Sequence, residues 1–512
     1  MSDAAHNSGT NATPHELKAR RSGIDTRDEP VVYMRADCPV CRSEGFRAHA
    51  RVFLKLRDRH VIATIHQVFG DLVGLDEAAL SEAAWHRLDP RPGDLVTVGH
   101  PRPLLSMSAV RSKVYGKRMD EESLDQVVGD LVAGRYSDIE AAAFITACAA
   151  HPLDLTEMGS LTRAMVESGE RLHWGRSPIA DKHCVGGLPG NRTTPIVVSI
   201  VAALGGTIPK TSSRAITSPA GTADMMETVA PVELDMPQIH RVVERTGGCL
   251  VWGGAVRFSP ADDLLIRIER ALDIDSEGQL VASVLSKKIA AGATHVLLDI
   301  PVGPTAKVRD ETAAARLTAS LSKIAALFDL KLRVVTSDGS QPIGRGIGPA
   351  LEAYDVLGVL QSHPTAPSDL RDKALRLSAE LLELVELAPP GRGLKAATEA
   401  LDQGQAWERF KEICEAQGGM RAPPRAEHRR PMPTTTSGQV VAVDNRKLAR
   451  VAKLAGAPDD KGAGIEIHVR VGDRVAKGEP LYTIHSENRG GLDYALEYAK
   501  QAEGVITIGD GE

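Results

Sequence analysis

The sequence has few cysteines, few aromatic residues and no excess of positive charge. Its 512 residues include six cysteines, 4% aromatic residues, and 61 Lys and Arg against 67 Asp and Glu, a net charge of −6 (61 − 67). Six cysteines are too few for a disulfide scaffold, so we expect reduced thiols. A protein that coats nucleic acid needs clustered Lys and Arg to neutralise phosphates. We therefore expect no nucleic-acid partner.

Long apolar runs are also missing. No stretch approaches about 18 uninterrupted apolar residues, and residues 1–23 lack the apolar core of a secretory signal. We therefore expect a cytoplasmic protein with no membrane partner. Apolar residues make up 42% of the chain and charged residues 25%, which is typical of globular proteins. The length suggests about three or four domains.

Composition and periodicity predict an α/β protein. We expect a helical domain and an α/β domain with a mixed, largely parallel sheet, flanked by small N-terminal and C-terminal α+β domains. The expected boundaries are residues 1–48 disordered, 49–104 a small N-terminal α+β domain, 105–176 the helical domain, completed by about 266–292, 177–420 the α/β domain, 421–438 a linker, and 439–512 the C-terminal α+β domain.

The N-terminal expectations depend on alternation of apolar and polar residues. Residues 1–48 are polar and show no sustained period, which favours disorder. Residues 51–58 and 60–69 alternate and predict two strands, a helix is expected near 76–84, and DLVTVG at 94–99 predicts another strand.

The helical domain is indicated by three blocks with apolar residues at helical spacing, residues 122–134, 137–150 and 154–169, with Ser137 and Asp154 as N-caps of the second and third. The linker is indicated by its prolines, which a helix or sheet interior excludes.

Near the C-terminus, residues 465–487 look like the half-barrel hairpin of biotinyl and lipoyl carrier domains. A carrier presents a lysine within an MKM or DKA triplet, and neither triplet occurs within residues 465–487. We therefore interpret the hairpin as structural, and a non-catalytic carrier or binding module stays as an alternative class.

A glycine-rich segment, DKHCVGGLPGNRTT at residues 181–194, combines positive charge with hydroxyls. Glycines allow a ligand to approach the backbone closely, hydroxyls and amides satisfy anionic oxygens, and Lys182 supplies a full charge. This pattern favours an oxyanion such as phosphate as the ligand. The alternative is an ordinary glycine-rich turn with incidental polar residues.

A second segment, KTSSRAITSPAGTAD at residues 210–224, places hydroxyls and a guanidinium before an expected helix start. Free N–H groups and the positive end of the helix dipole favour anions there. Two such loops in one α/β domain indicate a substrate that contains phosphate. Simple helix capping by Ser218 or Thr222 is the alternative and is compatible with it.

A third segment, residues 270–288, contains DIDSEGQLVASVLSKK. If it is helical, Ser283 and Lys287 are four residues apart and share one face. A hydroxyl beside an ammonium can recognise the carbonyl edge of a base. The alternatives are a solvated helix face, and Asp275 as a simple cap.

These three segments, with CLVWGGA at 249–255 and TSDGSQPIGRGIGPALEA at 336–353, resemble the thymidine and pyrimidine-nucleoside phosphorylase family. The likeness is greatest to its longer, type 2 branch, which also contains the archaeal AMP phosphorylases, and it covers about residues 50–510. The resemblance implies reversible phosphorolysis, in which inorganic phosphate attacks C1′ of a β-nucleoside and releases the free base and an α-pentose 1-phosphate. It implies no metal or other cofactor, phosphate being a co-substrate, and a homodimer formed through the helical domain.

The resemblance also implies roles for individual residues. The phosphate-binding side comprises Lys182, Cys184, Gly187, Thr194, Ser213, Arg214, Ala215, Ile216, Thr217, Ser218 and Thr222. The base-binding and substrate-binding side comprises His183, Arg270, Ser283, Lys287 and Lys307. His183 and Asp275 are the catalytic residues implied, with Asp275 as proton donor, a role that requires a raised carboxyl pKa.

Three positions depart from the family pattern. Cys184 stands where serine is usual, and a thiol is a weaker donor than a hydroxyl. TSPAGT at 217–222 replaces the GHTGGT of the shorter thymidine phosphorylases, and Pro219 has no N–H to donate. RALDID at 270–275 replaces the RPLSID of the relatives that act on AMP, which argues against a nucleotide substrate.

Thymidine phosphorolysis is the main hypothesis, and two other reactions stay open. Phosphorolysis of a nucleoside 5′-monophosphate such as AMP would give the free base and ribose 1,5-bisphosphate, with Lys210, Arg214 or Lys307 binding the 5′-phosphate. A phosphoribosyltransferase of the anthranilate type would need magnesium and a diphosphate donor.

Other residues carry weaker signals. Cys38 and Cys41 have zinc or redox spacing, but no second cysteine pair follows, so a structural role is favoured. Gly344, Gly346 and Gly348 do not have the spacing of a dinucleotide fingerprint. We expect His295 and Trp252 to be packed core residues rather than ligands.

Overall fold

Residues up to 109, together with 130–140, form one unit of the structure, and residues 110–129 with those from 141 onwards form a second. The structure is a computed structural model that describes residues 15–215, 218–256, 258–274 and 276–509. Within these ranges, no helix is both long and apolar enough to cross a membrane.

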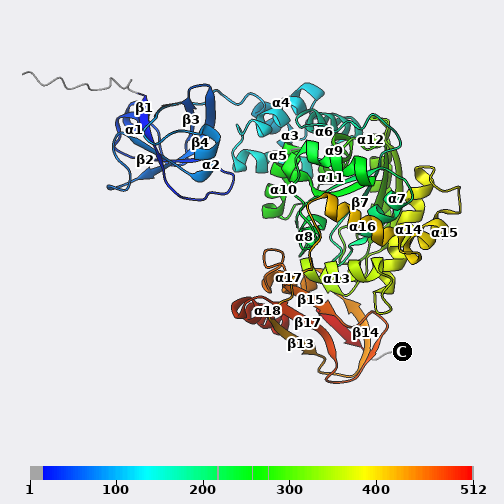
Figure 1. The fold of residues 1–512 in the computed structure, drawn as a ribbon. Helices are drawn as coiled ribbons and strands as arrows, with labels where there is room; N and C mark the ends of the chain where they lie inside the picture. The colour runs from blue at the N-terminus through cyan, green and yellow to red at the C-terminus, as the bar shows by residue number, and fades with distance from the viewer. Residues whose placement is uncertain (1–14, 216–217, 257, 275, 510–512) are drawn as a thin grey trace, which may run out of the picture. The chain divides into compact units, whose positions relative to one another are not determined.

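The first unit is a closed six-stranded barrel with two short helices (Figure 1). The strands are β1 (Glu16–Arg21), β2 (Val31–Arg35), β3 (Arg51–Leu56), β4 (Arg59–Val68), β5 (Glu77–Leu80) and β6 (Leu95–Gly99), in the order β1-β5-β2-β4-β3-β6, and the helices are α1 (Pro39–Glu44) and α2 (Glu82–Leu88). In β3, Val52, Leu54 and Leu56 are buried at alternate positions. Because successive strand side chains face opposite ways, such residues fill the barrel.

Residues 16–48 are ordered, so the expected disorder of the N-terminal segment is wrong for this range. They supply β1, β2 and α1. Leu17 and Ala19 of β1, like Val32 and Met34 of β2, belong to the barrel core. Each of these strands contributes only a short apolar alternation, too weak to detect before the partner strands are known.

The helix expected near 76–84 is also displaced. Residues Glu77–Leu80 form β5, which pairs with β1 and β2, and the helix begins only at Glu82, capped by Ser81. Pairing within the barrel therefore overrides the local helical preference of this alanine-rich stretch.

The helical domain contains α3 (Met107–Val114), α4 (Glu121–Val132), α5 (Asp138–Ala150) and α6 (Leu155–Glu167), with α10 (Pro260–Leu272) and α11 (Glu277–Ala290) joining from later in the chain. Helix α11 packs against α6. Both expected N-caps are confirmed. Asp154 forms a capping box with Glu157, and Ser137 accepts a hydrogen bond from the N–H of Glu140 (3.3 Å).

The α/β domain is built on parallel strands. Strands β7 (Ala180–Cys184), β10 (His295–Val302) and β11 (Lys331–Asp338) form a sheet in the order β11-β10-β7, and β8 (Ile208–Ser212) pairs with β9 (Gly248–Trp252). The helical elements of this domain are α7 (Thr193–Ala203), α8 (Thr222–Glu227), α9 (Met236–Thr246), the 3-10 turn at Gly253–Val256, α12 (Glu311–Ala326), α13 (Pro349–Leu360), α14 (Ser368–Leu384), α15 (Gly393–Asp402) and α16 (Gln405–Ala416). Helix α7 is buried from Thr193 to Ala202, so the core of the domain surrounds it.

The C-terminal domain joins the α/β domain through a shared sheet (Figure 1). Its elements are β13 (His428–Pro433), β14 (Gly438–Val443), α17 (Asn445–Leu454), β15 (Gly464–Ile467), β16 (Arg474–Val475), β17 (Pro480–Ser486), α18 (Arg489–Gln501) and β18 (Ile506–Gly509). Strand β12 (Gly346–Ile347) of the α/β domain is an edge strand of the sheet β12-β15-β17-β13. Strands β16, β14 and β18 form a second sheet in that order.

The linker expected at 421–438 is shorter than predicted. Strand β13 lies within it and pairs with β17, so residues 421–427 alone connect the domains without regular structure. Pro431 and Pro433 are tolerated because β13 is an edge strand, where a missing N–H breaks no ladder hydrogen bond.

Candidate active site

The ends of parallel strands β7 and β8 open into a cavity of about 450 Å³ in the second unit. The carboxyl edge of such strands is the usual place for a ligand in an α/β fold. Among the residues to which the sequence assigned a role, the structure brings to this cavity Lys182, His183, Cys184, Gly187, Thr194, Ser213, Arg214, Ala215, Ser218, Thr222, Arg270, Ser283, Lys287 and Lys307. Asp275, Ile216 and Thr217 lie outside the described residues. The three sequence segments thus form one site, while their roles stay predictions.

Lys182 is the most deeply placed cation of the site. It is wholly buried on β7, and its ammonium donates to the hydroxyls of Thr193 (2.8 Å) and Thr194 (3.4 Å) at the start of α7. Burial lowers the pKa of Lys182, while the carboxylate of Asp299 favours its charged form. No side chain among the described residues caps α7, so its first N–H groups are available to a ligand. A cation, two hydroxyls and a helix N-terminus together suit an anion.

Cys184 follows on the same strand. The Asn191 amide donates to its sulfur at 3.2 Å. Burial raises the pKa of the Cys184 thiol to about 12, so the group is uncharged at neutral pH and can donate weakly without repelling an anion. The turn that follows requires glycine at Gly190, because its φ is +71° and a Cβ there would lie 2.1 Å from the carbonyl oxygen of Ile343.

His183 is surrounded by cations. Burial and the nearby charges of Lys288 and Lys210 hold its pKa well below the usual value, so the imidazole is neutral. Asp181, buried on the same strand, lies 2.9 Å from the ammonium of Lys288 and 3.4 Å from that of Lys210. A neutral His183 can donate or accept a hydrogen bond at a substrate without adding charge.

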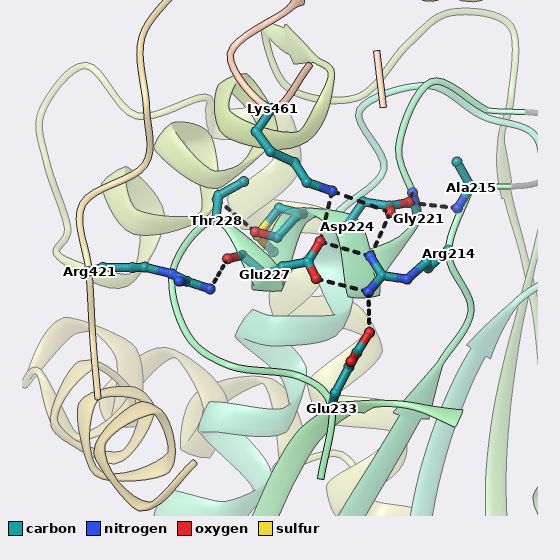
Figure 2. Close-up of polar contacts among 10 residues, drawn as sticks. Arg214, Ala215, Gly221, Asp224, Glu227, Thr228, Glu233, Arg421 and Lys461 are labelled. Carbon is teal, nitrogen blue, oxygen red and sulfur yellow. Dashed lines mark hydrogen bonds and ion pairs between the residues drawn. The ribbon is translucent and has the colours of Figure 1, made fainter. Parts of the chain in front are cut away.

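The loop after β8 is held by a group of charged residues that we call the loop clamp: Arg214, Asp224, Glu227, Glu233 and Lys461 (Figure 2). Asp224 accepts hydrogen bonds from the N–H groups at both ends of the loop, Ala215 (2.6 Å) and Gly221 (2.8 Å). The loop is therefore fixed at its two ends by one carboxylate.

The guanidinium of Arg214 points into the loop clamp. The resemblance implied a phosphate-binding role for Arg214, but here its N–H groups already bind carboxylates. It donates two hydrogen bonds to Glu227, both 2.8 Å, and one to Glu233 at 2.9 Å, and it stacks on Trp252 at 4.8 Å. These partners raise the pKa of Arg214. Trp252 is half-buried and packs against the core of the domain, as expected, and it also lines the cavity.

Lys461 brings the C-terminal domain into the clamp. Its ammonium lies 2.8 Å from a Glu227 carboxylate oxygen and 3.9 Å from one of Asp224 (Figure 2). Arg214 and Lys461 together lower the pKa of Glu227 to about 2, so that carboxylate stays ionised. Sequence reasoning missed Asp224, Glu227, Glu233 and Lys461, because no spacing along the chain indicates that they meet.

Helices α10 and α11 supply the opposite wall. Ser283 and Lys287 both line the cavity from α11, as their spacing predicts, and Lys287 donates to the buried Asp262 at 2.6 Å. Asp263, in the first turn of α10, also lines the cavity. Its side chain is exposed to the cavity, where partial desolvation, with a further contribution from Asp262, raises the pKa of its carboxyl. Sequence reasoning missed Asp263, because acidic residues such as Asp262 and Asp263 are common in the first turn of a helix and do not by themselves indicate a site.

Cys38 and Cys41 lie in the first unit. Both are buried in the barrel core, and Cys38 accepts a hydrogen bond from the Cys41 N–H (3.2 Å) as the N-cap of α1. Among the described residues, no group of three or more His, Cys, Asp or Glu could hold a metal ion. The pair therefore has a capping role in the described structure.

Three family models match the chain. They are the glycosyl transferase family helical bundle domain at residues 107–169, the glycosyl transferase family a/b domain at 176–407, and the pyrimidine nucleoside phosphorylase C-terminal domain at 439–505.

Two relatives from bacteria illustrate the similarity. A protein of Polaromonas sp. (strain JS666), named "Putative thymidine phosphorylase", is 58% identical over 499 residues, which cover 97% of this chain and 98% of the relative. "Putative thymidine phosphorylase 2" of Acidovorax sp. (strain JS42) is 56% identical over 511 residues and 100% of both chains. Among solved structures, anthranilate phosphoribosyltransferase from Thermus thermophilus matches with a TM-score of 0.51 and 20% identity over 60% of this chain and 99% of that one. That last likeness concerns the fold alone.

Proposed function

The chain belongs to the pyrimidine nucleoside phosphorylase family of glycosyl transferases and is a pentosyltransferase, and on that basis we propose that it catalyses the reversible phosphorolysis of thymidine. The products would be thymine and 2-deoxy-α-D-ribose 1-phosphate. The observation that carries the proposal is the meeting, in one cavity, of a buried cation with hydroxyls on one wall and the side chains of Ser283 and Lys287, the proposed base-binding pair, on the other.

Phosphate would bind at the start of α7. Lys182, the hydroxyls of Thr193 and Thr194 and the uncapped helix N-terminus offer charge and donors, and the neutral Cys184 thiol adds a weak one. Held there, a phosphate oxygen forms the new bond to C1′ as the bond from C1′ to N1 of thymine breaks. The rest of the loop 213–218, including Ile216 and Thr217, is proposed to line the sugar phosphate.

The base would bind between α10 and α11. N1 leaves with the electron pair of the broken bond, so negative charge develops on the ring, and Arg270, Ser283 and Lys287 would stabilise it at the carbonyl oxygens. Asp275 is proposed to supply the proton, and the neutral His183 to donate a hydrogen bond to the base.

A nucleoside is favoured over a nucleoside 5′-monophosphate. A 5′-phosphate needs its own cationic pocket, and the candidate cations have partners already. Arg214 binds the carboxylates of the loop clamp, and Lys210 lies 3.4 Å from Asp181. These contacts support thymidine as the substrate.

The test is release of free base from thymidine, uridine, AMP and CMP, each with and without inorganic phosphate. Phosphate-dependent release of thymine is the expected result. Release from AMP or CMP with none from thymidine would replace the proposal by nucleotide phosphorolysis to ribose 1,5-bisphosphate. Activity that appears only with magnesium and a diphosphate donor would indicate a phosphoribosyltransferase instead.

We further propose that the enzyme needs no metal or other cofactor, acts in pyrimidine nucleoside metabolism in the cytoplasm, and forms a homodimer through its helical domain. Turnover that is unchanged after EDTA treatment is expected. For the proposed homodimer, light scattering should give the mass of two chains, and the mass of one chain would contradict the proposal.

A further inference from the structure

A second cavity, of about 1020 Å³, lies in the second unit at the place where the connecting segment 421–427 runs between α13 and the C-terminal sheet. None of the described residues that line it also lines the candidate active site. Its walls come from α13, residues 361–367, α16, the connecting segment and the strands β13, β15 and β17. Its volume is at the upper end of the range for small-molecule sites.

Four arginines line this cavity: Arg345, Arg421, Arg425 and Arg429. Within the described residues, no carboxylate oxygen lies within ion-pairing distance of any of them. Three donate instead to neutral oxygens, Arg345 to the carbonyl of Thr365 (3.0 Å), Arg421 to that of Glu227 (2.5 Å) and Arg425 to the Tyr354 hydroxyl (3.2 Å). Because a guanidinium has five N–H donors, each of the three keeps several for a ligand.

The two acidic residues of the cavity offset part of this charge, because the Arg345 guanidinium acts electrostatically on both carboxylates, and each also has a further partner. Asp355 accepts hydrogen bonds from the backbone N–H groups of Arg345 (2.6 Å) and Gly346 (2.7 Å), and Glu466 lies 3.6 Å from His485. The buried Nε2 of His485 is the atom that faces Glu466 at this distance, slightly beyond hydrogen-bond length. With four arginines against two carboxylates, the lining is thus positive overall.

The remaining wall is apolar. Leu351, Leu357, Ala366, Met420 and Pro423 line it, and the rings of Tyr354 and Trp407 border it. Arginines beside an apolar and aromatic wall match a ligand that joins an anionic group to a flat ring. We propose that this cavity binds a nucleoside polyphosphate, with its phosphates at the four arginines and its base against the apolar wall. The inference does not depend on the proposed reaction.

The test is calorimetric titration of the full-length protein with ADP, pyrophosphate and adenosine. ADP is expected to bind about tenfold more tightly than either fragment, because each fragment lacks one half of the contacts. Pyrophosphate equal to ADP would overturn the base contact, and adenosine equal to ADP would overturn the phosphate contact.

A matched pair of variants locates the site. Arg429 lines the cavity, whereas its neighbour Arg430 on β13 does not. Arg425→Gln with Arg429→Gln should weaken ADP binding about tenfold, the loss expected for one or two charge-assisted hydrogen bonds, while Arg430→Gln should leave it unchanged. Equal losses in both proteins would overturn the proposal.

Hydrogen exchange on the unaltered protein gives an independent readout. ADP should protect backbone amides of residues 420–430. Protection confined to residues 182–194 would place the nucleotide in the active site and overturn the proposal, even if a variant failed to fold.

Discussion

At the residue scale, Lys182 is a buried cation without full compensation of its charge by hydrogen-bond partners. Its ammonium donates to two threonine hydroxyls, which cannot neutralise it, and burial disfavours its charge. Replacement by Met keeps the length of the side chain and removes the charge. We expect Lys182→Met to lower phosphorolysis by about 10²–10³-fold, a loss typical of a group that stabilises transition-state charge.

Lys323→Met, on the exposed face of α12, is the matched control and should leave turnover unchanged. Initial rates and the thermal midpoint of both proteins are the measurements. Full activity in the Lys182 variant would refute its assignment to phosphate.

Cys184 allows a finer test of the phosphate side. Its thiol is neutral because burial raises its pKa to about 12, and a hydroxyl is a stronger donor at the same place. We expect Cys184→Ser to lower the KM for phosphate about two- to fivefold, the gain from one improved hydrogen bond. Cys249→Ser serves as the comparison, since Cys249 is also a free cysteine of this domain, fully buried where Cys184 is half-buried, and does not line the cavity. A raised KM in the Cys184 variant alone would show that the sulfur makes no favourable contact with phosphate.

At the scale of elements, the loop clamp connects α8 to the loop after β8. Lys461 is one of two cations that balance three carboxylates there. We expect Lys461→Met to raise the KM for substrate about two- to fivefold, because a partly exposed ion pair contributes about 0.5–1 kcal/mol to holding the loop. Lys477→Met, an exposed lysine of the same domain, should have no effect. Steady-state kinetics at several substrate concentrations separate KM from kcat, and an unchanged KM would contradict the coupling.

The same elements show what can be read from a sequence. The parallel strands and the capped helices could be predicted, because long apolar runs and capping residues are local signals. The glycine-rich segment and the Ser283 and Lys287 pair could also be placed at a site, since each lies within one contiguous stretch.

The failures share one cause. Strands β1 and β13 are stabilised by partners that lie far along the chain, and their own sequences alternate too briefly or carry prolines. Lys461 and Glu227 likewise meet only because the C-terminal domain folds back on α8. Such contacts depend on tertiary structure, which no spacing rule records.

At the scale of the whole molecule, the α/β domain and the C-terminal domain share a sheet through β12 and β15. Gly464, on β15, has a φ of +150°, and a Cβ there would lie 2.1 Å from the carbonyl oxygen of Ile347. We expect Gly464→Ala to lower the thermal midpoint by several degrees more than Gly472→Ala does. Gly472 also has a positive φ, +99°, but a Cβ there meets no atom within 4 Å.

The difference between these two glycine variants isolates the clash from the backbone strain that they share. Thermal unfolding followed by circular dichroism measures it. Equal midpoints would mean that the shared sheet can move apart at little cost in free energy.

The shared sheet also limits how this chain can be rearranged. A domain that is joined to its neighbour only by a flexible linker can be exchanged between proteins. The C-terminal domain pairs β15 with β12 of the α/β domain and supplies Lys461 to the loop clamp. Its removal would expose unpaired backbone groups on β12. The hairpin that looks like a carrier module is therefore an integral part of the second unit. A chimera with a different C-terminal domain must keep Lys461 and Gly464, or provide another strand that pairs with β12 and another cation for Glu227.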